Sequence, residues 1–403
     1  MTMQITGAQG SVLSGLFIHY MTVVAVRSSV LPLFYPFLLM EFGWDSTQVT
    51  AAATLGYFMS AGLSAVVAPL FDKLPVRNVM LAGILLICGG LFLYAGINSI
   101  STMMAIYAVL ALGQACCGQV PVMVLTTRWF TRNRGMAIGA VMTATSVGGA
   151  IFPLLVRPLL ADGDWRATVA QLALMNSVLL VLPWLFLIRN KPAPATPAAA
   201  AKSDTASTPL RPLAVIEFSL LALVTGGIWF IVNGMLQHQS ILMSRELQIP
   251  LATIPLVVSV YFWSAIAGKL LSGYIGDRVD KRLSLLIGVI SLIIGILILR
   301  VFGAGAIYLY AIFFGFGFGS TASLMQMLIA EYYAGANYGK VLGLLTMIDI
   351  GAGGLGIPSM AYLERYYGSY MPVLEMLLVL CGVVVAGILY LGYLGRAYSA
   401  RLV

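Results

Sequence analysis

Charged residues are scarce in this sequence. Only 9% of the 403 residues are Asp, Glu, Lys or Arg, whereas 60% are hydrophobic, and the mean hydropathy is +0.97. A soluble globular domain carries about 25% charged residues, so water alone cannot solvate a surface of this composition. The scarcity excludes a soluble enzyme, a disordered chain and a nucleic-acid-binding domain, and it indicates a protein whose solvent is lipid.

Cysteine and histidine are also rare. The four cysteines lie in apolar stretches without a C-x-x-C or Cys/His spacing, which favours small buried apolar residues over a disulfide framework or a metal site. No Walker A or G-x-S-x-G motif is present, so the sequence predicts neither an enzyme nor a cofactor. The N-terminus lacks a basic n-region, and the apolar run after it is too long for a signal peptide.

Long apolar runs fill most of the chain. A membrane helix needs about 20 mostly apolar residues, and these runs do not alternate as barrel strands would. The sequence therefore predicts an all-α membrane protein with twelve spans. The expected spans are 11–38, 47–70, 79–97, 102–127, 135–159, 167–188, 214–240, 251–276, 283–302, 305–330, 340–362 and 371–394.

Lysine and arginine placement predicts the orientation. Most of the 22 basic residues, beginning with Lys73 and Arg77, fall on the side that is cytoplasmic if both termini are cytoplasmic. The net charge of +8 is then a topology signal that needs no nucleic-acid partner. Residues 191–212 are rich in Pro, Ala, Ser and Thr, which indicates a flexible cytoplasmic linker. It separates two six-helix bundles, residues 1–190 and 213–403.

The two halves repeat at an offset of 205 residues. Asp72, Lys73 and Arg77 correspond to Asp277, Arg278 and Arg282, and Gly148, Gly149 and Pro153 correspond to Gly353, Gly354 and Pro358. The first set ends spans 2 and 8, and the second lies within spans 5 and 11. Because the order of elements is preserved, the halves are parallel repeats, a feature of many transporters.

These features resemble the major facilitator superfamily. The similarity rests on the loop motifs FDKLPVRN (71–78) and GDRVDKR (276–282), the six-linker-six layout and the glycine-rich fifth and eleventh helices. The resemblance implies a transporter whose site lies between the halves. It makes Asp72, Arg77, Asp277, Arg278 and Arg282 candidate gating residues, although ordinary topology-setting loop charges would explain them as well.

Shorter segments resemble the monocarboxylate and oxalate–formate branch of this superfamily. They are RWFTRNRGMAIG (128–139), NYGKVLGL (337–344) and YGSY (367–370). In that branch a cation, usually Arg, precedes the helix-8 glycine by four residues; here Lys269 precedes Gly273. Animal relatives carry an Asp one turn earlier, where this chain has Ala265. The branch's helix-1 lysine has no counterpart in register, although Arg27 could replace it.

Three ionisable residues lie deep within predicted spans: Arg27, Lys269 and Asp349. Each costs a few kcal/mol in the membrane and is a functional candidate by default. None recurs as a charge at the 205 offset, so the fold does not require them. Together they leave one surplus positive charge, which a bound monoanion would neutralise. The alternative is a buried Lys269–Asp349 ion pair that has only a structural role.

Polar and aromatic residues at helical spacing accompany these charges. We predict substrate binding by Arg27, Lys269, Tyr20, Asn233, Gln237, His238 and Phe262. For Asn233 and Gln237 the alternative is hydrogen bonding between helices, and for His238 it is a position at the membrane interface. Asp349 is the candidate for proton coupling, the alternative being a fixed structural partner of Lys269.

The sequence predicts a monomeric secondary transporter in the plasma membrane or the bacterial inner membrane. The expected substrate is a small organic anion, most simply a monocarboxylate, moved through the bilayer by alternating access with or without protons. Three alternatives remain: an anion:cation symporter, a drug or cation exporter of the same fold, and a membrane sensor that does not transport. The exporter would need an uncompensated intramembrane acid, whereas here bases outnumber acids within the spans, and the sensor would normally carry a further soluble domain.

Overall fold

The computed structural model describes residues 6–131, 134–160, 163–190, 212–276, 278–333 and 338–399. Within these ranges every regular element is a helix, which confirms the predicted fold class. The predicted linker falls almost wholly on 191–211, outside the described residues, and Asp277 lies outside them as well.

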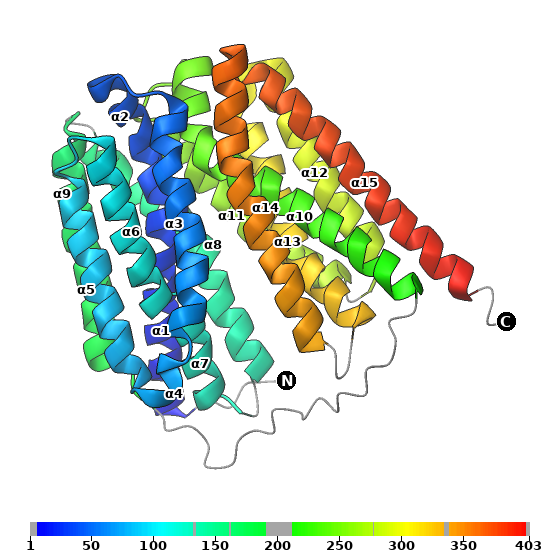
Figure 1. The fold of residues 1–403 in the computed structure, drawn as a ribbon, viewed down its shortest axis with the longest axis horizontal. Helices are drawn as coiled ribbons and strands as arrows, with labels where there is room; N and C mark the ends of the chain where they lie inside the picture. The colour runs from blue at the N-terminus through cyan, green and yellow to red at the C-terminus, as the bar shows by residue number, and fades with distance from the viewer. Residues whose placement is uncertain are drawn as a thin grey trace. The chain divides into compact units, whose positions relative to one another are not determined.

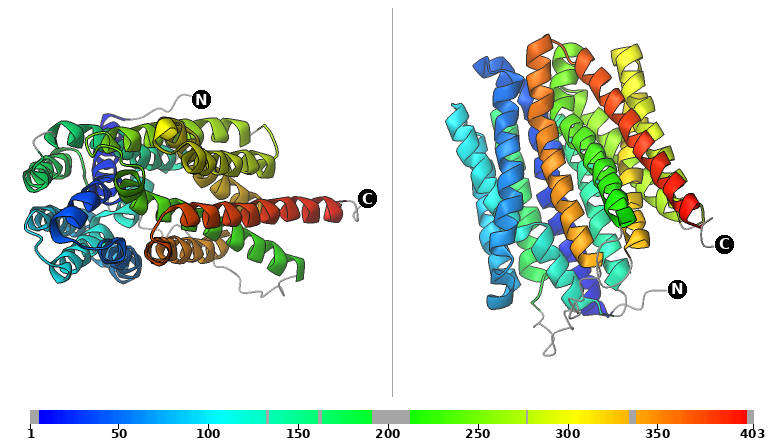
Figure 2. Two further views of the ribbon diagram at one scale, coloured as in Figure 1. Left: turned by 90° about the horizontal axis from the view of Figure 1, so that it is seen from above. Right: turned by 45° about the vertical axis from the view of Figure 1, so that its right-hand side comes forward.

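The chain divides into two compact units. The first comprises Met1–Pro197 together with Pro250–Ser259. Its helices pack side by side as a bundle, which Figure 2 shows nearly end-on. They are α1 (Gly7–Ala25), the π-helix η1 (Val26–Val30), the 3₁₀-helix η2 (Leu31–Phe34), α2 (Tyr35–Phe42), α3 (Ser46–Val67), α4 (Leu70–Lys73), α5 (Val76–Tyr94), α6 (Ile100–Cys117), α7 (Gln119–Trp129), α8 (Arg134–Leu159) and α9 (Trp165–Phe186).

The second unit comprises Ala198–Ile249 and Val260–Val403. Within it α10 packs along α14, and α12 packs along α13 and α15 (Figure 1). Its helices are α10 (Pro212–Ile241), the π-helix η3 (Leu242–Glu246), α11 (Ile254–Gly276) from Val260 onward, α12 (Lys281–Phe302), the 3₁₀-helix η4 (Gly303–Ala306), α13 (Ile307–Tyr332), α14 (Tyr338–Tyr367) and α15 (Met371–Ser399).

Twelve helical spans account for most of the chain. By length and composition, 11 apolar helical segments in the described part can cross a membrane. One of them, Lys281–Tyr332, is 52 residues long and contains both α12 and α13, which meet at η4. Dividing it there gives the predicted twelve. Large apolar side chains such as Val66 and Val379 are 71% and 69% exposed, as expected of helix faces that lipid covers.

The first span is irregular in its C-terminal half. Pro32 and Pro36 lack the backbone N–H that continues an α-helix, and around them the chain forms a π turn followed by a 3₁₀ turn. Gly43 then ends α2 in the left-handed conformation, with φ of 66°. Arg27 lies in the π turn. Such turns inside α-helices are frequent at functional sites.

Glycines bring the first and fifth span of each unit into close contact. A Cβ added at Gly148 of α8 would lie 2.4 Å from the Met21 carbonyl oxygen of α1, and one added at Gly356 of α14 would lie 2.3 Å from the Phe230 carbonyl oxygen of α10. No side chain fits at either position. Small residues of this kind let membrane helices pack backbone to backbone.

A pair of glutamates follows the same internal repeat. Glu41 accepts hydrogen bonds from Trp165 Nε1 (2.5 Å) and Arg166 Nη2 (2.7 Å) at the start of α9. Its counterpart 205 residues later, Glu246, accepts from Ser369 Oγ (2.7 Å) and the Tyr370 N–H (3.1 Å) before α15. In each unit an acid at the end of the first span therefore anchors the start of the sixth.

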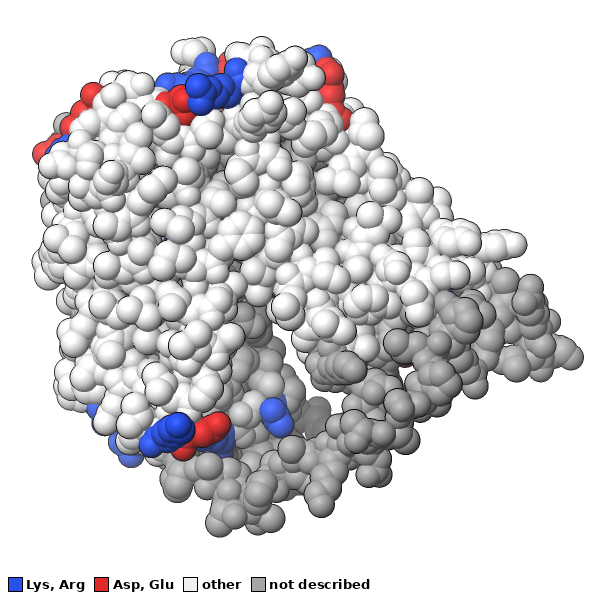
Figure 3. All heavy atoms as spheres, viewed as in Figure 1, with Lys and Arg blue, Asp and Glu red and all other residues white. Residues whose placement is uncertain are grey.

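One face of the first unit carries its charged side chains at the two ends. On the face shown in Figure 3, Lys, Arg, Asp and Glu lie at the two ends of this bundle, with uncharged residues between them. The Arg166–Glu41 ion pair, at 2.7 Å, belongs to one of these ends. This distribution matches a bundle whose middle faces hydrocarbon.

Candidate functional site

Arg27 lies among tyrosines in the first unit. Its Nη1 donates to Ser60 Oγ of α3 at 2.8 Å, and its guanidinium carbon lies 4.9 Å from the centre of the Tyr57 ring. The phenol groups of Tyr20, Tyr35 and Tyr107 also lie close enough to interact electrostatically with it. In the described part of the chain, no acidic side chain forms an ion pair with Arg27. The guanidinium is therefore a partly buried cation that neutral groups surround.

The tyrosines around Arg27 are held by the bundle. Tyr35 and Tyr107 share a hydrogen bond between their hydroxyls at 2.9 Å, and both side chains are buried. Tyr20, predicted as a site residue, is only 4% exposed. Because α1, η1, α2, α3 and α6 each supply a side chain, the surroundings of the cation depend on the packing of the whole unit.

A cavity of about 20 Å³ borders the same guanidinium. Besides Arg27, its polar lining comes from Tyr107 and Gln114, and Gly56 leaves room on the α3 side. The other lining residues are Val23, Val26, Leu31, Ile87, Leu110 and Ala111. No hydrogen bond from another described residue reaches the Gln114 side chain. The cavity thus combines a cation and a free amide with otherwise apolar walls.

Phe318 of α13 lies next to two of the predicted site residues of the second unit, Lys269 and Phe262. Lys269 Nζ of α11 lies 5.9 Å from the centre of the Phe318 ring. The ring of Phe262, also predicted, meets Phe318 edge-on at 6.3 Å, and that of Trp229 does so from α10 at the same distance. The structure therefore brings Lys269 and Phe262 together around an aromatic residue of α13 that the sequence did not single out.

Asp349 is held by α10. Its Oδ1 accepts a hydrogen bond from Thr225 Oγ1 at 2.6 Å, and the side chain of Trp229 lies near the same carboxyl group. Within the described ranges, no ion pair joins Asp349 to Lys269. The two charges are instead linked through Trp229 and Phe318, whose rings are in contact. Among the described residues, the direct Lys269–Asp349 pair considered from the sequence is therefore not formed.

The polar residues of α10 lie in the packed interior of the second unit. Asn233 and Gln237 are 9% and 7% exposed, and both have interaction partners. His238 uses both ring nitrogens: Nε2 donates to the Ile357 carbonyl at 2.9 Å, and Nδ1 accepts from the Tyr370 hydroxyl at 2.8 Å. A carbonyl can only accept, which fixes this tautomer. His238 therefore joins α10 to α14 and to the turn before α15.

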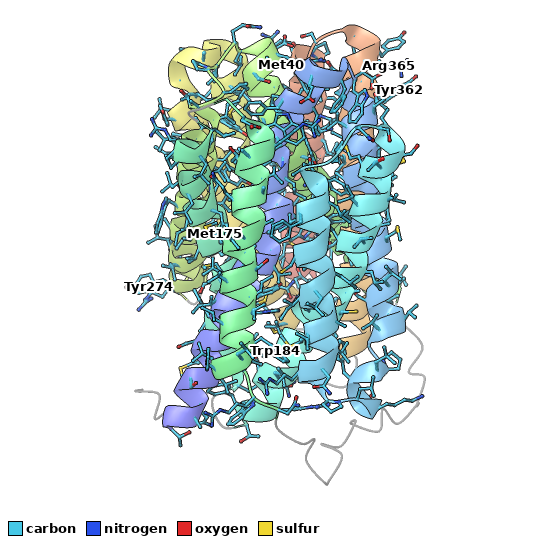
Figure 4. All side chains as sticks on the ribbon, turned by 90° about the vertical axis from the view of Figure 1, so that its left-hand side faces the viewer. Met40, Met175, Trp184, Tyr274, Tyr362 and Arg365 are labelled. Carbon is cyan, nitrogen blue, oxygen red and sulfur yellow. The ribbon has the colours of Figure 1, made fainter. Side chains whose placement is uncertain are left out.

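Arg77 forms hydrogen bonds to the C-terminal end of α9. Its guanidinium donates to the carbonyls of Trp184 (3.0 and 3.2 Å) and Leu185 (3.2 Å), and it lies 4.3 Å from the centre of the Trp184 ring system. Trp184 Nε1 donates back to the Arg77 carbonyl at 2.8 Å. Figure 4 shows Trp184 at the opposite end of this unit from Met40. Asp72 is exposed, and no ion pair with Arg77 is present among the described residues.

The corresponding arginines of the second unit also contact aromatic rings. Arg278 lies 3.5 Å from the Tyr274 ring centre and donates to the Tyr274 carbonyl at 3.2 Å. Arg282 lies 5.3 Å from the Tyr332 ring centre. Figure 4 shows Tyr274 at the end of this unit opposite to Tyr362 and Arg365. The partner expected for these arginines, Asp277, lies outside the described residues.

Sequence reasoning missed the neutral partners of the charges. They are Tyr57, Ser60, Thr225, Trp229 and Phe318, and the cavity residue Gln114 was missed as well. A partial signal was available, because Tyr57 and Ser60 are three residues apart and Thr225 and Trp229 four apart, so each pair shares a helix face. Nothing in the spacing shows which charge such a face meets, since the partners come from other helices.

Comparison with known proteins agrees with this architecture. The sequence profile of the Major Facilitator Superfamily matches residues 16–242 and again 218–401. The chain is 25% identical to the MFS transporter asaE of Aspergillus flavus over 340 residues, covering 81% of this chain and 73% of that protein. It is 23% identical to monocarboxylate transporter 13 of Rattus norvegicus over 384 residues, covering 89% and 83%.

A solved structure shows the same fold. The crystal structure of the nucleoside transporter NupG superimposes with a TM-score of 0.77 at 14% identity, covering 94% of this chain and 99% of that one. The profile matches both halves of the chain, and the structure supplies the apolar helices and the repeated glycine contacts. This chain therefore belongs to the Major Facilitator Superfamily and is a multi-pass membrane protein with the fold of its transporters.

Proposed function

We propose that this protein is a secondary transporter of a small organic anion and that Arg27 receives the carboxylate. The observation that carries the proposal is the lack of an acidic partner for Arg27 in the described part of the chain. An unpaired cation within a membrane span costs a few kcal/mol. A bound carboxylate would offset that cost, and its geometry matches the fork of a guanidinium.

The second cation supports an anionic substrate. Lys269 lies on α11 beside the aromatic cluster of Phe318, Phe262 and Trp229. We assign it to substrate binding as a point charge, since an ammonium has no bidentate fork. The likeness to monocarboxylate transporter 13 across 89% of the chain supports the same substrate class. We assign His238 a structural role, because both of its nitrogens are already bonded within the fold.

Asp349 supports proton coupling as a second part of the proposal. Its carboxylate accepts a hydrogen bond from the neutral hydroxyl of Thr225 and forms no ion pair within the described ranges. Such a carboxylate can take up a proton without breaking a salt bridge. We propose that it does so during transport, so that substrate and proton cross together.

Uptake by purified protein in liposomes tests both parts. A panel of labelled monocarboxylates is offered with and without an inward proton gradient, and a labelled organic cation is offered in parallel. We expect carboxylate uptake that the gradient stimulates and that Arg27→Gln lowers at least tenfold. Uptake or export of the cation instead would favour a drug or cation exporter. Stimulation by a sodium gradient alone would favour an anion:cation symporter.

A further inference from the structure

The cavity beside Arg27 is small and lies within the first unit. Its walls come from α1, η1, η2, α3, α5 and α6, and its volume is about 20 Å³. A space of roughly 10–15 Å³ already holds one water molecule. The cavity therefore has room for one water-sized species, and the body of an organic acid does not fit inside it.

The charges around this cavity favour an anion. Arg27 supplies a full positive charge, and the groups that contact it are the Ser60 hydroxyl and the Tyr57 ring, both neutral. The Gln114 amide lines the same space and has no hydrogen-bond partner among the described residues. Its NH₂ group can donate to a bound anion. The remaining walls are apolar apart from Tyr107, so they supply no competing negative charge.

We propose that this cavity binds a chloride-sized monatomic anion against Arg27 and Gln114. This inference rests on the proposed function, because it assigns the same guanidinium to both ligands. The halide neutralises Arg27 when no organic substrate is bound, and an incoming carboxylate displaces it. Chloride should therefore act as a competitor that raises the apparent KM for the organic anion and leaves the maximal rate unchanged.

Halide binding can be measured on the full-length protein without any organic substrate. The protein in nanodiscs is titrated with sodium chloride or bromide against sodium isethionate at constant ionic strength, and the melting temperature and the ³⁵Cl line width are recorded. We expect chloride and bromide to raise the melting temperature of the wild type, because a ligand that binds the folded state stabilises it. Sulfate, a larger anion, should not compete with chloride.

Two variants, each with a matched control, test the site by charge and by space. Arg27→Gln should weaken halide binding at least tenfold, whereas Arg157→Gln, which removes an exposed cation from α8, should not change it. Gly56→Ala adds a Cβ 3.1 Å from the Tyr107 ring and fills part of the cavity, while Gly89→Ala on α5 places its Cβ in open space. We expect halide binding to be weaker in Gly56→Ala and unchanged in Gly89→Ala.

These measurements distinguish failure of the halide site from failure of the proposed function. No halide-dependent stabilisation or line broadening in the folded wild type overturns the halide site. Equal effects in Arg27→Gln and the wild type, or competition by sulfate, overturn it as well. If carboxylate uptake still depends on Arg27 in those cases, the proposed function stands and only the halide site fails. If halide binds as expected but no carboxylate is transported, the substrate assignment fails instead.

Discussion

Replacement of Arg27 by Gln is the most direct test of the substrate assignment. A guanidinium has five N–H donors, and here one Nη1 donor is directed to Ser60 at 2.8 Å while no acidic side chain in the described chain competes for the others. A hydrogen bond to a charged group contributes about 1.5–3 kcal/mol. Its loss corresponds to about a 10- to 150-fold weaker affinity for the carboxylate.

The assay is initial-rate uptake of a labelled carboxylate into liposomes over a range of concentrations. Arg27→Gln should raise KM by the stated factor or abolish measurable uptake, while Arg27→Lys should retain part of the activity because it keeps the charge and loses the fork. Ser60→Ala serves as the control that removes a neutral neighbour and leaves the cation. Wild-type kinetics in a folded Arg27→Gln protein would refute the reasoning.

Three further predictions concern coupling, packing and the repeated glutamates. Asp349→Asn should preserve carboxylate counterflow and abolish stimulation by a pH gradient; loss of both activities together would instead assign Asp349 a structural role. Arg77→Ala should lower the melting temperature, because it removes the hydrogen bonds that cap the end of α9, whereas Asp72→Asn should leave the melting temperature unchanged. Equal melting temperatures of the two variants would contradict the contacts of Arg77. The gating role of Asp72 is tested separately, by cysteine-accessibility labelling of Asp72→Asn. Glu41→Gln and Glu246→Gln should each reduce the free energy of unfolding, because each removes the charge that accepts the hydrogen bonds at the start of the sixth span. The loss should be only about 1 kcal/mol, since both acids are partly exposed. Thermal unfolding that shows no loss in either variant would mean that these contacts add nothing to stability.

The depth of the charges along the chain could be predicted, whereas their partners could not. Lys269 and Asp349 are expected at similar depth from the fixed rise of a helix, and depth alone allows an ion pair. In the structure Lys269 instead lies beside the Phe318 ring and Asp349 near Trp229, because the rotation of α11 and α14 about their axes follows from packing against α10 and α13. Sequence spacing contains no information on that rotation.

The sequence by itself determined the twelve spans, the division into two repeats and the presence of Arg27 within the first span. The physical reason is that lipid leaves each backbone polar group to be satisfied inside its own helix, so apolar length alone specifies a span. Only the tertiary structure decided that Arg27 is surrounded by Tyr57, Ser60 and a small cavity and that Arg77 caps α9. These contacts join helices far apart in the chain, and they depend on close packing that glycines such as Gly148 allow.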